Sequence, residues 1–203
     1  MNTTQSESLK GRKIAILATN GFEQDELFEP KKALENAGAK VDIVSPEHDE
    51  IKSWKEKDWG KKIKVDVELD QANASSYDGI VLPGGVINPD QLRMNPTAVR
   101  FVKSFVDAKK PIAAICHGPW TLIETGVLKS GRKLTSWPSL RTDLVNAGAK
   151  WVDEEVVVDQ GLITSRKPAD LEAFNEKMIE EFSSRPLLKP QWSERAPDRG
   201  SYN

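Results

Sequence analysis

The sequence predicts an α/β fold with a mostly parallel central sheet. Compact apolar runs that are typical of buried strands alternate with amphipathic stretches that are typical of helices. The links between them are short: a strand at 13–19, a helix at 25–39 and a strand at 40–46 follow in succession. Such β-α-β units place their strands parallel in one sheet.

The first helix is predicted from its apolar spacing. Leu27, Phe28 and Leu34 recur at helical intervals, and Gly38 is a typical stop after the last turn. Pro30 predicts either a late helix start or a kink.

Further elements follow in the same alternation. Residues 47–62 are charged and turn-rich, which predicts a surface excursion or hairpin carrying Trp54 and Trp59. Strands are expected at 64–70, 77–85, 111–116, 133–137, 156–159 and 162–165, and helices at 95–110, 118–131, 139–149 and 168–182.

The organisation is one domain with two polar ends. We expect a polar segment at 1–11, a single domain at 12–183 and an extended arm at 184–203, which has three prolines and no periodicity. The arm is either disordered or wraps a neighbouring subunit through Leu187, Leu188 and Trp192.

Composition narrows the class of protein. The net charge of −2 over 203 residues predicts no nucleic-acid or anionic-membrane footprint. A single cysteine excludes an internal disulfide, which suits a reducing compartment. The N-terminus lacks the apolar core of a signal peptide, and no apolar run reaches membrane-spanning length. We therefore expect a soluble cytoplasmic protein.

Cys116 is the first candidate for chemistry, in "AAICHGPW" at 113–120. A predicted strand ends at this cysteine and a predicted helix follows, which is the layout of a nucleophile elbow. The positive end of that helix favours a thiolate and lowers the pKa of the thiol below its free value of ~8.5. The alternative is a small core residue, since free cysteine is among the most buried residue types. This stretch alone leaves both interpretations open.

Glycines predict places where backbone approaches a ligand. Gly84 and Gly85 in "LPGG" either present amides to an oxyanion or form a plain turn. Gly118 leaves room for a substrate beside Cys116. Asp90 in "NPDQL" follows Asn88, which we expect to cap a helix, so its position needs no function to explain it.

Few groups can exchange a proton with Cys116. Glu23, in "GFEQDEL", is either a protonated carboxyl that hydrogen-bonds the sulfur or a solvated loop acid. The two histidines are His48, in the charged excursion, and His117. A triad with a base far downstream of the cysteine is therefore excluded, and the acceptor is His117, Glu23 or a residue of another subunit. There is no cysteine-histidine metal cluster and no GxGxxG or Walker-type phosphate loop, so we expect no metal and no cofactor.

Taken in order, the motifs resemble the DJ/PfpI superfamily, which is related to class I glutamine amidotransferases. The matching stretches are "GFEQDEL", "YDGIVLPGG", "AAICHGPW", "TSW", "LVNAGAKWVDEEVVVD" and "TSRKPADLEAF", and they span about residues 12 to 183. The likeness is greatest to the branch of PfpI-like intracellular proteases and general stress proteins. It implies a flavodoxin-like doubly wound sandwich that self-associates as a dimer or hexamer.

The resemblance also implies roles for single residues. Cys116 corresponds to the elbow nucleophile, and His117 to the neighbouring catalytic histidine whose amide belongs to the oxyanion hole. Glu23 corresponds to the acid that hydrogen-bonds the thiol, Gly85 with Gly84 to the second oxyanion donor, and Asp90 to an acid that reaches the histidine of an adjacent subunit. Two features depart from the family pattern: Gln24 stands where an acid is usual, and the 47–62 excursion and the arm are long.

Three functions follow from these residues. The first is a cysteine-dependent stress-response enzyme, a hydrolase or lyase, that converts reactive carbonyls such as methylglyoxal or early glycation adducts without glutathione. The second is an intracellular cysteine peptidase or amidase of PfpI type, whose partner is a peptide substrate. The third is a redox sensor or chaperone that uses Cys116 without turnover.

Overall fold

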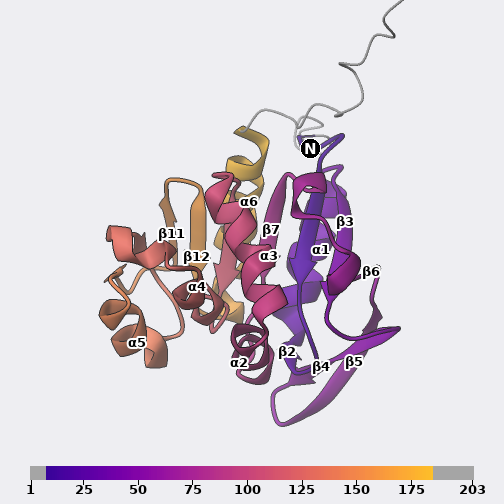
Figure 1. Cartoon of the computed structure of the whole chain (residues 1–203), viewed down its shortest axis with the longest axis horizontal. Helices are drawn as coiled ribbons and strands as arrows, with labels where there is room; N and C mark the ends of the chain where they lie inside the picture. Colours follow the sequence, from indigo (N-terminus) through magenta and orange to yellow (C-terminus); the bar gives the residue numbers. More distant parts are fainter. Residues whose placement is uncertain (1–7, 185–203) are drawn as a thin grey trace, which may run out of the picture.

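The computed structural model describes residues 8–184, and a seven-stranded sheet forms its centre (Figure 1). The strand order is β11 (Val156–Asp159), β12 (Leu162–Ser165), β8 (Ile112–Ile115), β7 (Gly79–Leu82), β1 (Lys13–Leu17), β3 (Lys40–Ser45) and β6 (Val67–Glu68). Only the β11–β12 pair of this sheet is antiparallel. The predicted mostly parallel α/β fold is confirmed, and it is of the flavodoxin-like type.

Helices cover both faces of this sheet. The longer ones are α1 (Gln24–Asn36), α2 (Ile87–Met94), α3 (Pro96–Asp107) and α6 (Leu171–Ser184), and two short ones are α4 (Trp120–Thr125) and α5 (Arg141–Asn146). Figure 1 shows α3 in front of β7 and α6 on the far side of the sheet. Single 3-10 turns are η1 (Leu69–Gln71), η2 (Ala74–Ser76), η3 (Val127–Ser130), η4 (Pro138–Leu140) and η5 (Pro168–Asp170).

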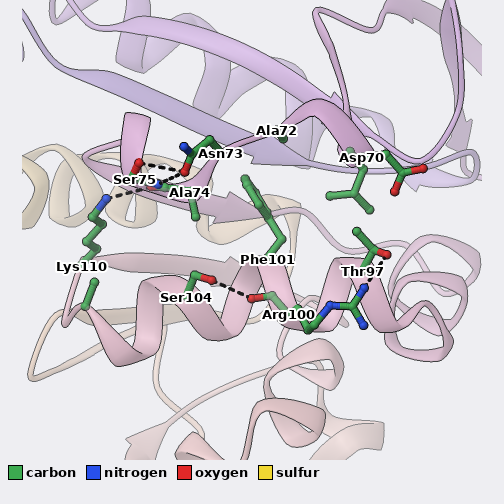
Figure 2. Close-up of a pocket in the computed structure, with 12 residues that line it drawn as sticks. Asp70, Ala72, Asn73, Ala74, Ser75, Thr97, Arg100, Phe101, Ser104 and Lys110 are labelled. Carbon is green, nitrogen blue, oxygen red and sulfur yellow. Dashed lines mark hydrogen bonds between the residues drawn. The ribbon is translucent and has the colours of Figure 1, made fainter. Parts of the chain in front are cut away.

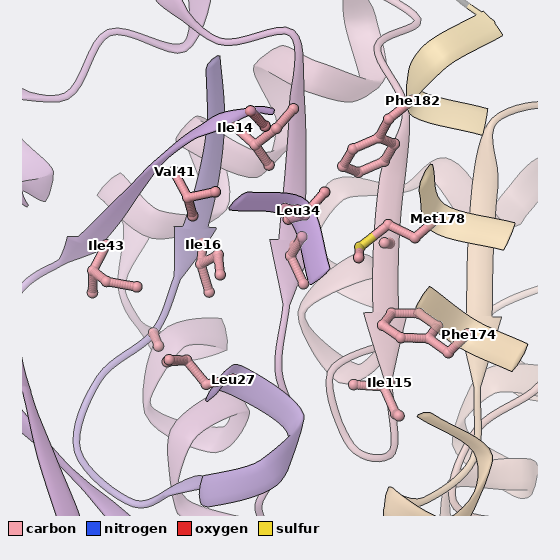
Figure 3. Close-up of a cluster of buried hydrophobic side chains, with 14 of the residues drawn as sticks. Ile14, Ile16, Leu27, Leu34, Val41, Ile43, Ile115, Phe174, Met178 and Phe182 are labelled. Atoms are coloured by element: carbon pink, nitrogen blue, oxygen red, sulfur yellow. The ribbon is translucent and has the colours of Figure 1, made fainter. Parts of the chain in front are cut away.

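Alternating side chains of the strands build two apolar layers. Ile14 and Ile16 of β1 pack with Phe174 and Met178 of α6 on one face (Figure 3). The next residue along, Ala15, faces the α3 side of the sheet, with side chains such as Phe101, Val102 and Phe105. Strands buried on both faces read as continuous apolar runs, which is why the sequence signal for these strands was strong.

Two small sheets lie beside the central one. β2 (Phe22–Glu23), β4 (Glu50–Lys55) and β5 (Asp58–Lys64) form the first, in which β4 and β5 are an antiparallel hairpin. This hairpin is the predicted charged excursion, and Trp54 meets Trp59 edge-on across it. β9 (Lys133–Leu134) pairs with β10 (Lys150–Trp151) in the second.

Several predicted elements differ in extent. The strand expected at 64–70 is only β6, because a 3-10 turn begins at Leu69. The strand expected at 133–137 is two residues long and lies outside the central sheet. The helix expected at 118–131 is α4 followed by η3, separated by Gly126 in the left-handed conformation. α1 runs through Pro30 and begins at Gln24, so the proline marks no late start.

The ends of the domain can be placed only in part. Leu9 is fully buried and its N–H donates to the carbonyl of Ala37, so the packed domain reaches back into the predicted polar segment. Of the predicted arm only Ser184, the last residue of α6, lies within the described residues. Among residues 8–184, no helix is both long and apolar enough to cross a membrane.

Candidate active site

Cys116 lies at a sharp turn directly after the central strand β8. Its N–H donates to the carbonyl of Ser165 on β12, which continues the strand ladder to this residue. The chain then turns through φ 61° at Cys116, in the left-handed region that non-glycine residues rarely occupy. This strained turn is the geometry of a nucleophile elbow. It lies at the carboxyl edge of the sheet, where open α/β folds place their sites.

Gly118 allows the close backbone packing of this turn. A Cβ at this position would collide with the carbonyl oxygens of Leu82 and Ile115. Both are backbone atoms that cannot move aside cheaply, so the glycine is required by chain packing under the elbow. The predicted substrate space beside Gly118 stays a prediction, because this packing by itself explains the glycine.

The acid that touches the thiol is Glu26, which corrects the prediction of Glu23. Glu26 is fully buried, and its Oε2 accepts a hydrogen bond of 2.9 Å from the N–H of Gly84. Its carboxyl also acts on the Cys116 thiol and raises the pKa of that thiol. Its Oε1 is buried and forms no hydrogen bond among the described residues, so it is available to the sulfur.

Glu23 instead caps helix α1. Its carboxylate accepts the N–H of Glu26 at 2.9 Å, and it is half-buried. An N-cap side chain bends back onto its own helix, so the Glu23 carboxylate is engaged by the first turn of α1. The sequence did contain a signal for Glu26. Glu26, Pro30 and Leu34 follow one another at intervals of four residues, which places them on the same, buried face of α1.

Two backbone amides face the sulfur. The N–H groups of His117 and Gly85 both act on the Cys116 sulfur and lower the pKa of its thiol. Gly85 reaches this place with φ 76°, packed against the backbone of Gly21 and Glu23. The structure thus brings the two predicted oxyanion donors together at the predicted nucleophile.

Burial, however, raises the pKa of the Cys116 thiol, and the charge of Glu26 raises it further. The prediction of a lowered pKa for this thiol considered only the helix after Cys116. That helix, α4, is six residues long and begins four residues after Cys116. Burial likewise raises the pKa of Glu26 to about 8. At neutral pH Glu26 is therefore mostly protonated. A protonated carboxyl carries no charge to oppose a thiolate and donates an O–H to the sulfur.

His117 lies against the sulfur on its other side. Its Nδ1 is 3.2 Å from Sγ of Cys116, and its Nε2 is 3.5 Å from Oγ of Ser139. Trp120 meets the imidazole edge-on and Trp137 stacks over it. Burial lowers the pKa of His117, so the ring is neutral at pH 7.

Other predicted groups lie apart from the sulfur. Asp90 is exposed on α2, and within the described residues no hydrogen bond or ion pair joins its carboxylate to His117. His48 is exposed and pairs with Glu68 at 3.0 Å. This agrees with leaving it out of the candidate proton acceptors for Cys116. The described residues contain no group of three or more His, Cys, Asp or Glu side chains placed to hold a metal ion.

A hollow of about 640 Å³ lies elsewhere on the surface, between α3 and the η1–η2 segment (Figure 2). Phe101, Arg100 and Lys110 are among its lining residues. Lys110 donates to the carbonyls of Ala74 and Tyr77 and so holds the hollow's edge together. The hollow contains none of the residues around Cys116.

Comparison with known proteins identifies the family of this chain. The sequence profile of the DJ-1/PfpI family matches residues 12–181. The chain belongs to this family. Its members include YraA of Bacillus subtilis (strain 168), provisionally named a cysteine protease, which is 44% identical over 168 residues that cover 83% of this chain and 96% of YraA.

Two further DJ-1/PfpI relatives extend the comparison. Deglycase PfpI of Pyrococcus furiosus is 42% identical over 167 residues, covering 82% of this chain and 97% of PfpI. The crystal structure of Drosophila melanogaster DJ-1beta superposes with a TM-score of 0.77 at 31% identity, covering 86% of this chain and 91% of that one. The fold and the family are therefore established independently of the site.

Proposed function

We propose that this protein is a cysteine enzyme that converts small reactive carbonyls, with methylglyoxal as the test substrate, and needs neither glutathione nor a cofactor. The names of its relatives, a deglycase and a provisional protease, support an enzyme of this family and leave the reaction open. The observation that carries our choice is the fully buried Glu26 carboxyl against the sulfur of Cys116. Such a pair can deliver and recover one proton within a dry site.

The first step uses the thiolate and both amides. Sγ of Cys116 adds to the aldehyde carbon of methylglyoxal, and the C=O electron pair moves to the oxygen. The N–H groups of Gly85 and His117 stabilise that oxyanion, and the O–H of Glu26 protonates it. The product is a hemithioacetal on Cys116, and Glu26 is left as a carboxylate.

The following steps move protons and then release the product. The Glu26 carboxylate or neutral His117 removes the hydrogen from the carbon bonded to sulfur as a proton and delivers a proton to the ketone oxygen, which gives an enediol. Protonation of the neighbouring carbon, with loss of the O–H proton from the carbon bonded to sulfur, then gives a lactoyl thioester on Cys116. Water cleaves this thioester into lactate and the free thiol. The sum is the conversion of methylglyoxal and water to lactate and a proton, with no external oxidant or reductant.

The test is lactate formation from methylglyoxal by the purified protein without glutathione, compared with Cys116→Ala and Cys116→Ser. We expect steady turnover by the wild type and none above background by either variant. Because Cys116 is the chain's single cysteine, its alkylation by iodoacetamide reports directly whether the thiol is competent. A folded wild type with an alkylatable Cys116 and no lactate would overturn the proposal for this substrate.

A second candidate is peptide or amide hydrolysis. It is favoured by the 3.2 Å contact between Nδ1 of His117 and Sγ of Cys116, which is the pairing that activates a cysteine nucleophile. Such a pair needs a third group to orient the histidine, and in the described residues Nε2 faces only Ser139. Asp90 of a second copy would supply that acid, so peptidase activity is expected only from an assembled oligomer.

A further inference from the structure

Asn88 is a fully buried polar side chain close to Cys116. Both the oxygen and the nitrogen of its amide form hydrogen bonds. Its Oδ1 accepts the N–H of Thr19, just after β1, at 2.8 Å. Its Nδ2 donates to the carbonyls of Pro83 and Gly84, at 3.0 and 3.2 Å. The side chain thus ties the end of β1 to the loop between β7 and α2.

Asn88 is not the helix cap that the sequence predicted. α2 begins at Ile87, the residue before it, and the cap position is Val86, whose side chain makes no capping hydrogen bond. A capping asparagine would accept from the helix's own amides, whereas this one accepts from a strand end. Its three hydrogen bonds therefore need a different explanation.

The two carbonyls that Asn88 binds belong to consecutive peptide groups. The first group joins the Pro83 carbonyl to the Gly84 N–H, which donates to Glu26 at 2.9 Å. The second joins the Gly84 carbonyl to the Gly85 N–H, which acts on the Cys116 sulfur and lowers the pKa of its thiol. A trans peptide group is planar with its N–H opposite its C=O, so fixing the carbonyl fixes the direction of the N–H.

We propose that Asn88 is a positioning residue that aims two amide donors at once, that of Gly84 at Glu26 and that of Gly85 at the nucleophile. Glycines depend on such fixing hydrogen bonds more than other residues do, since they lack the side chains that restrict backbone rotation. The N–H of Glu23 adds a weaker contact of 3.3 Å to the Gly84 carbonyl, whereas Asn88 holds both peptide groups.

The test is the pH dependence of Cys116 alkylation by iodoacetamide in wild type and Asn88→Ala. The substitution removes both donors without adding a charge. We expect the Gly85 amide to lose its aim, so that the midpoint of alkylation moves upward by about one pH unit, a tenfold loss of thiolate at fixed pH. Asn88→Ser, whose hydroxyl can satisfy one carbonyl, is measured in parallel and should shift the midpoint less. It also stands in as the test variant if Asn88→Ala does not fold.

The matched control is Asn95→Ala. Asn95 also uses its side chain to bind backbone, accepting the N–H groups of Thr97 and Ala98 at the start of α3. Its loss should lower the melting temperature and leave the alkylation midpoint unchanged. An Asn88 variant that folds and keeps the wild-type midpoint would overturn the proposal.

Turnover gives an independent second readout. This part of the test rests on the proposed function, and kcat for lactate formation should fall about 10- to 100-fold in Asn88→Ala with a smaller change in KM. The two proposals fail separately. A shifted alkylation midpoint in a protein that makes no lactate refutes the carbonyl reaction alone, whereas unchanged alkylation and unchanged turnover refute the role of Asn88 alone.

Discussion

At the residue scale, two glutamates three positions apart have opposite environments. Glu23 sits before the first turn of α1 and binds the N–H of Glu26. Glu26 sits one turn later on the buried face and binds the N–H of Gly84 beside the thiol. Chemistry at Cys116 should therefore depend on Glu26, and the role of Glu23 should be to stabilise the helix.

The pair Glu26→Gln and Glu23→Gln tests this division. We expect Glu26→Gln to lower kcat for lactate formation about 100-fold or more, because general acid–base groups contribute roughly 10²–10⁴. Glu23→Gln should keep activity within about threefold of wild type while lowering stability by about 1 kcal/mol, since it weakens the cap. Steady-state kinetics and urea unfolding measure the two effects. Equal losses of activity in both variants would contradict the assignment.

Stability should also depend on pH through Glu26. Its pKa is about 8 in the folded protein, because burial disfavours the charge, against 4.5 without burial. Between these values the folded state keeps a proton that the unfolded chain releases. The contribution is therefore fully present below pH 4.5 and is lost as pH rises toward 8.

Urea unfolding of wild type and Glu26→Gln at pH 5 and pH 8 checks this sign. Wild type should lose stability between the two pH values, and the loss should be smaller in Glu26→Gln, which has no carboxyl to ionise. Glu23→Gln is the control, because it leaves Glu26 in place. A loss of the same size in wild type and Glu26→Gln would show that Glu26 does not titrate as described.

At the scale of elements, the elbow depends on close contact between strand ends. Cys116 turns with a positive φ, and Gly118 then passes against the carbonyl of Leu82 at the end of β7. Cys116, the two amides that act on its sulfur and the end of β7 are consequently one packed unit. A shift of the turn would move the sulfur away from both amides.

Gly118→Ala and Gly126→Ala distinguish the effect of this packing from the conformational free-energy cost of replacing a glycine that has a positive φ. The added methyl at 118 meets backbone oxygens, so we expect a loss of about 1–3 kcal/mol together with loss of turnover. Gly126 has φ 76° and open space around it, so Gly126→Ala should cost roughly 1–2 kcal/mol and leave turnover intact. Thermal unfolding and lactate formation give the two readouts. An active Gly118→Ala would contradict the packing argument.

At the scale of the whole molecule, one sheet is shared by two apolar layers. Phe174 of α6 and Phe105 of α3 are both fully buried, on opposite faces. Since the same strands support both layers, the described domain should unfold as one cooperative unit.

Phe174→Ala and Phe105→Ala test that cooperativity. Each should cost about 3–5 kcal/mol, and each should unfold in a single transition seen equally by circular dichroism and tryptophan fluorescence. Two separate transitions in either variant would show that the layers melt independently.

The dependence of activity on self-association distinguishes the carbonyl reaction from peptide hydrolysis. The carbonyl reaction uses groups of one chain, so its specific activity should not depend on protein concentration. Peptide hydrolysis that borrows Asp90 from a second copy should rise with concentration and be lost in Asp90→Asn. Assays from nanomolar to micromolar protein, with sedimentation at the same concentrations, check both expectations.

The sequence determined the alternation of strands and helices, because strands buried on both faces are continuous apolar runs and helices show a period near 3.6. The resemblance of its motifs to the DJ/PfpI superfamily also indicated that Cys116, His117 and the paired glycines share one site. Only the tertiary structure decided which glutamate meets the thiol, that Gly118 packs on backbone and that Asn88 holds the glycine loop. These depend on side-chain direction and on contacts between residues far apart in the chain, which local patterns do not encode.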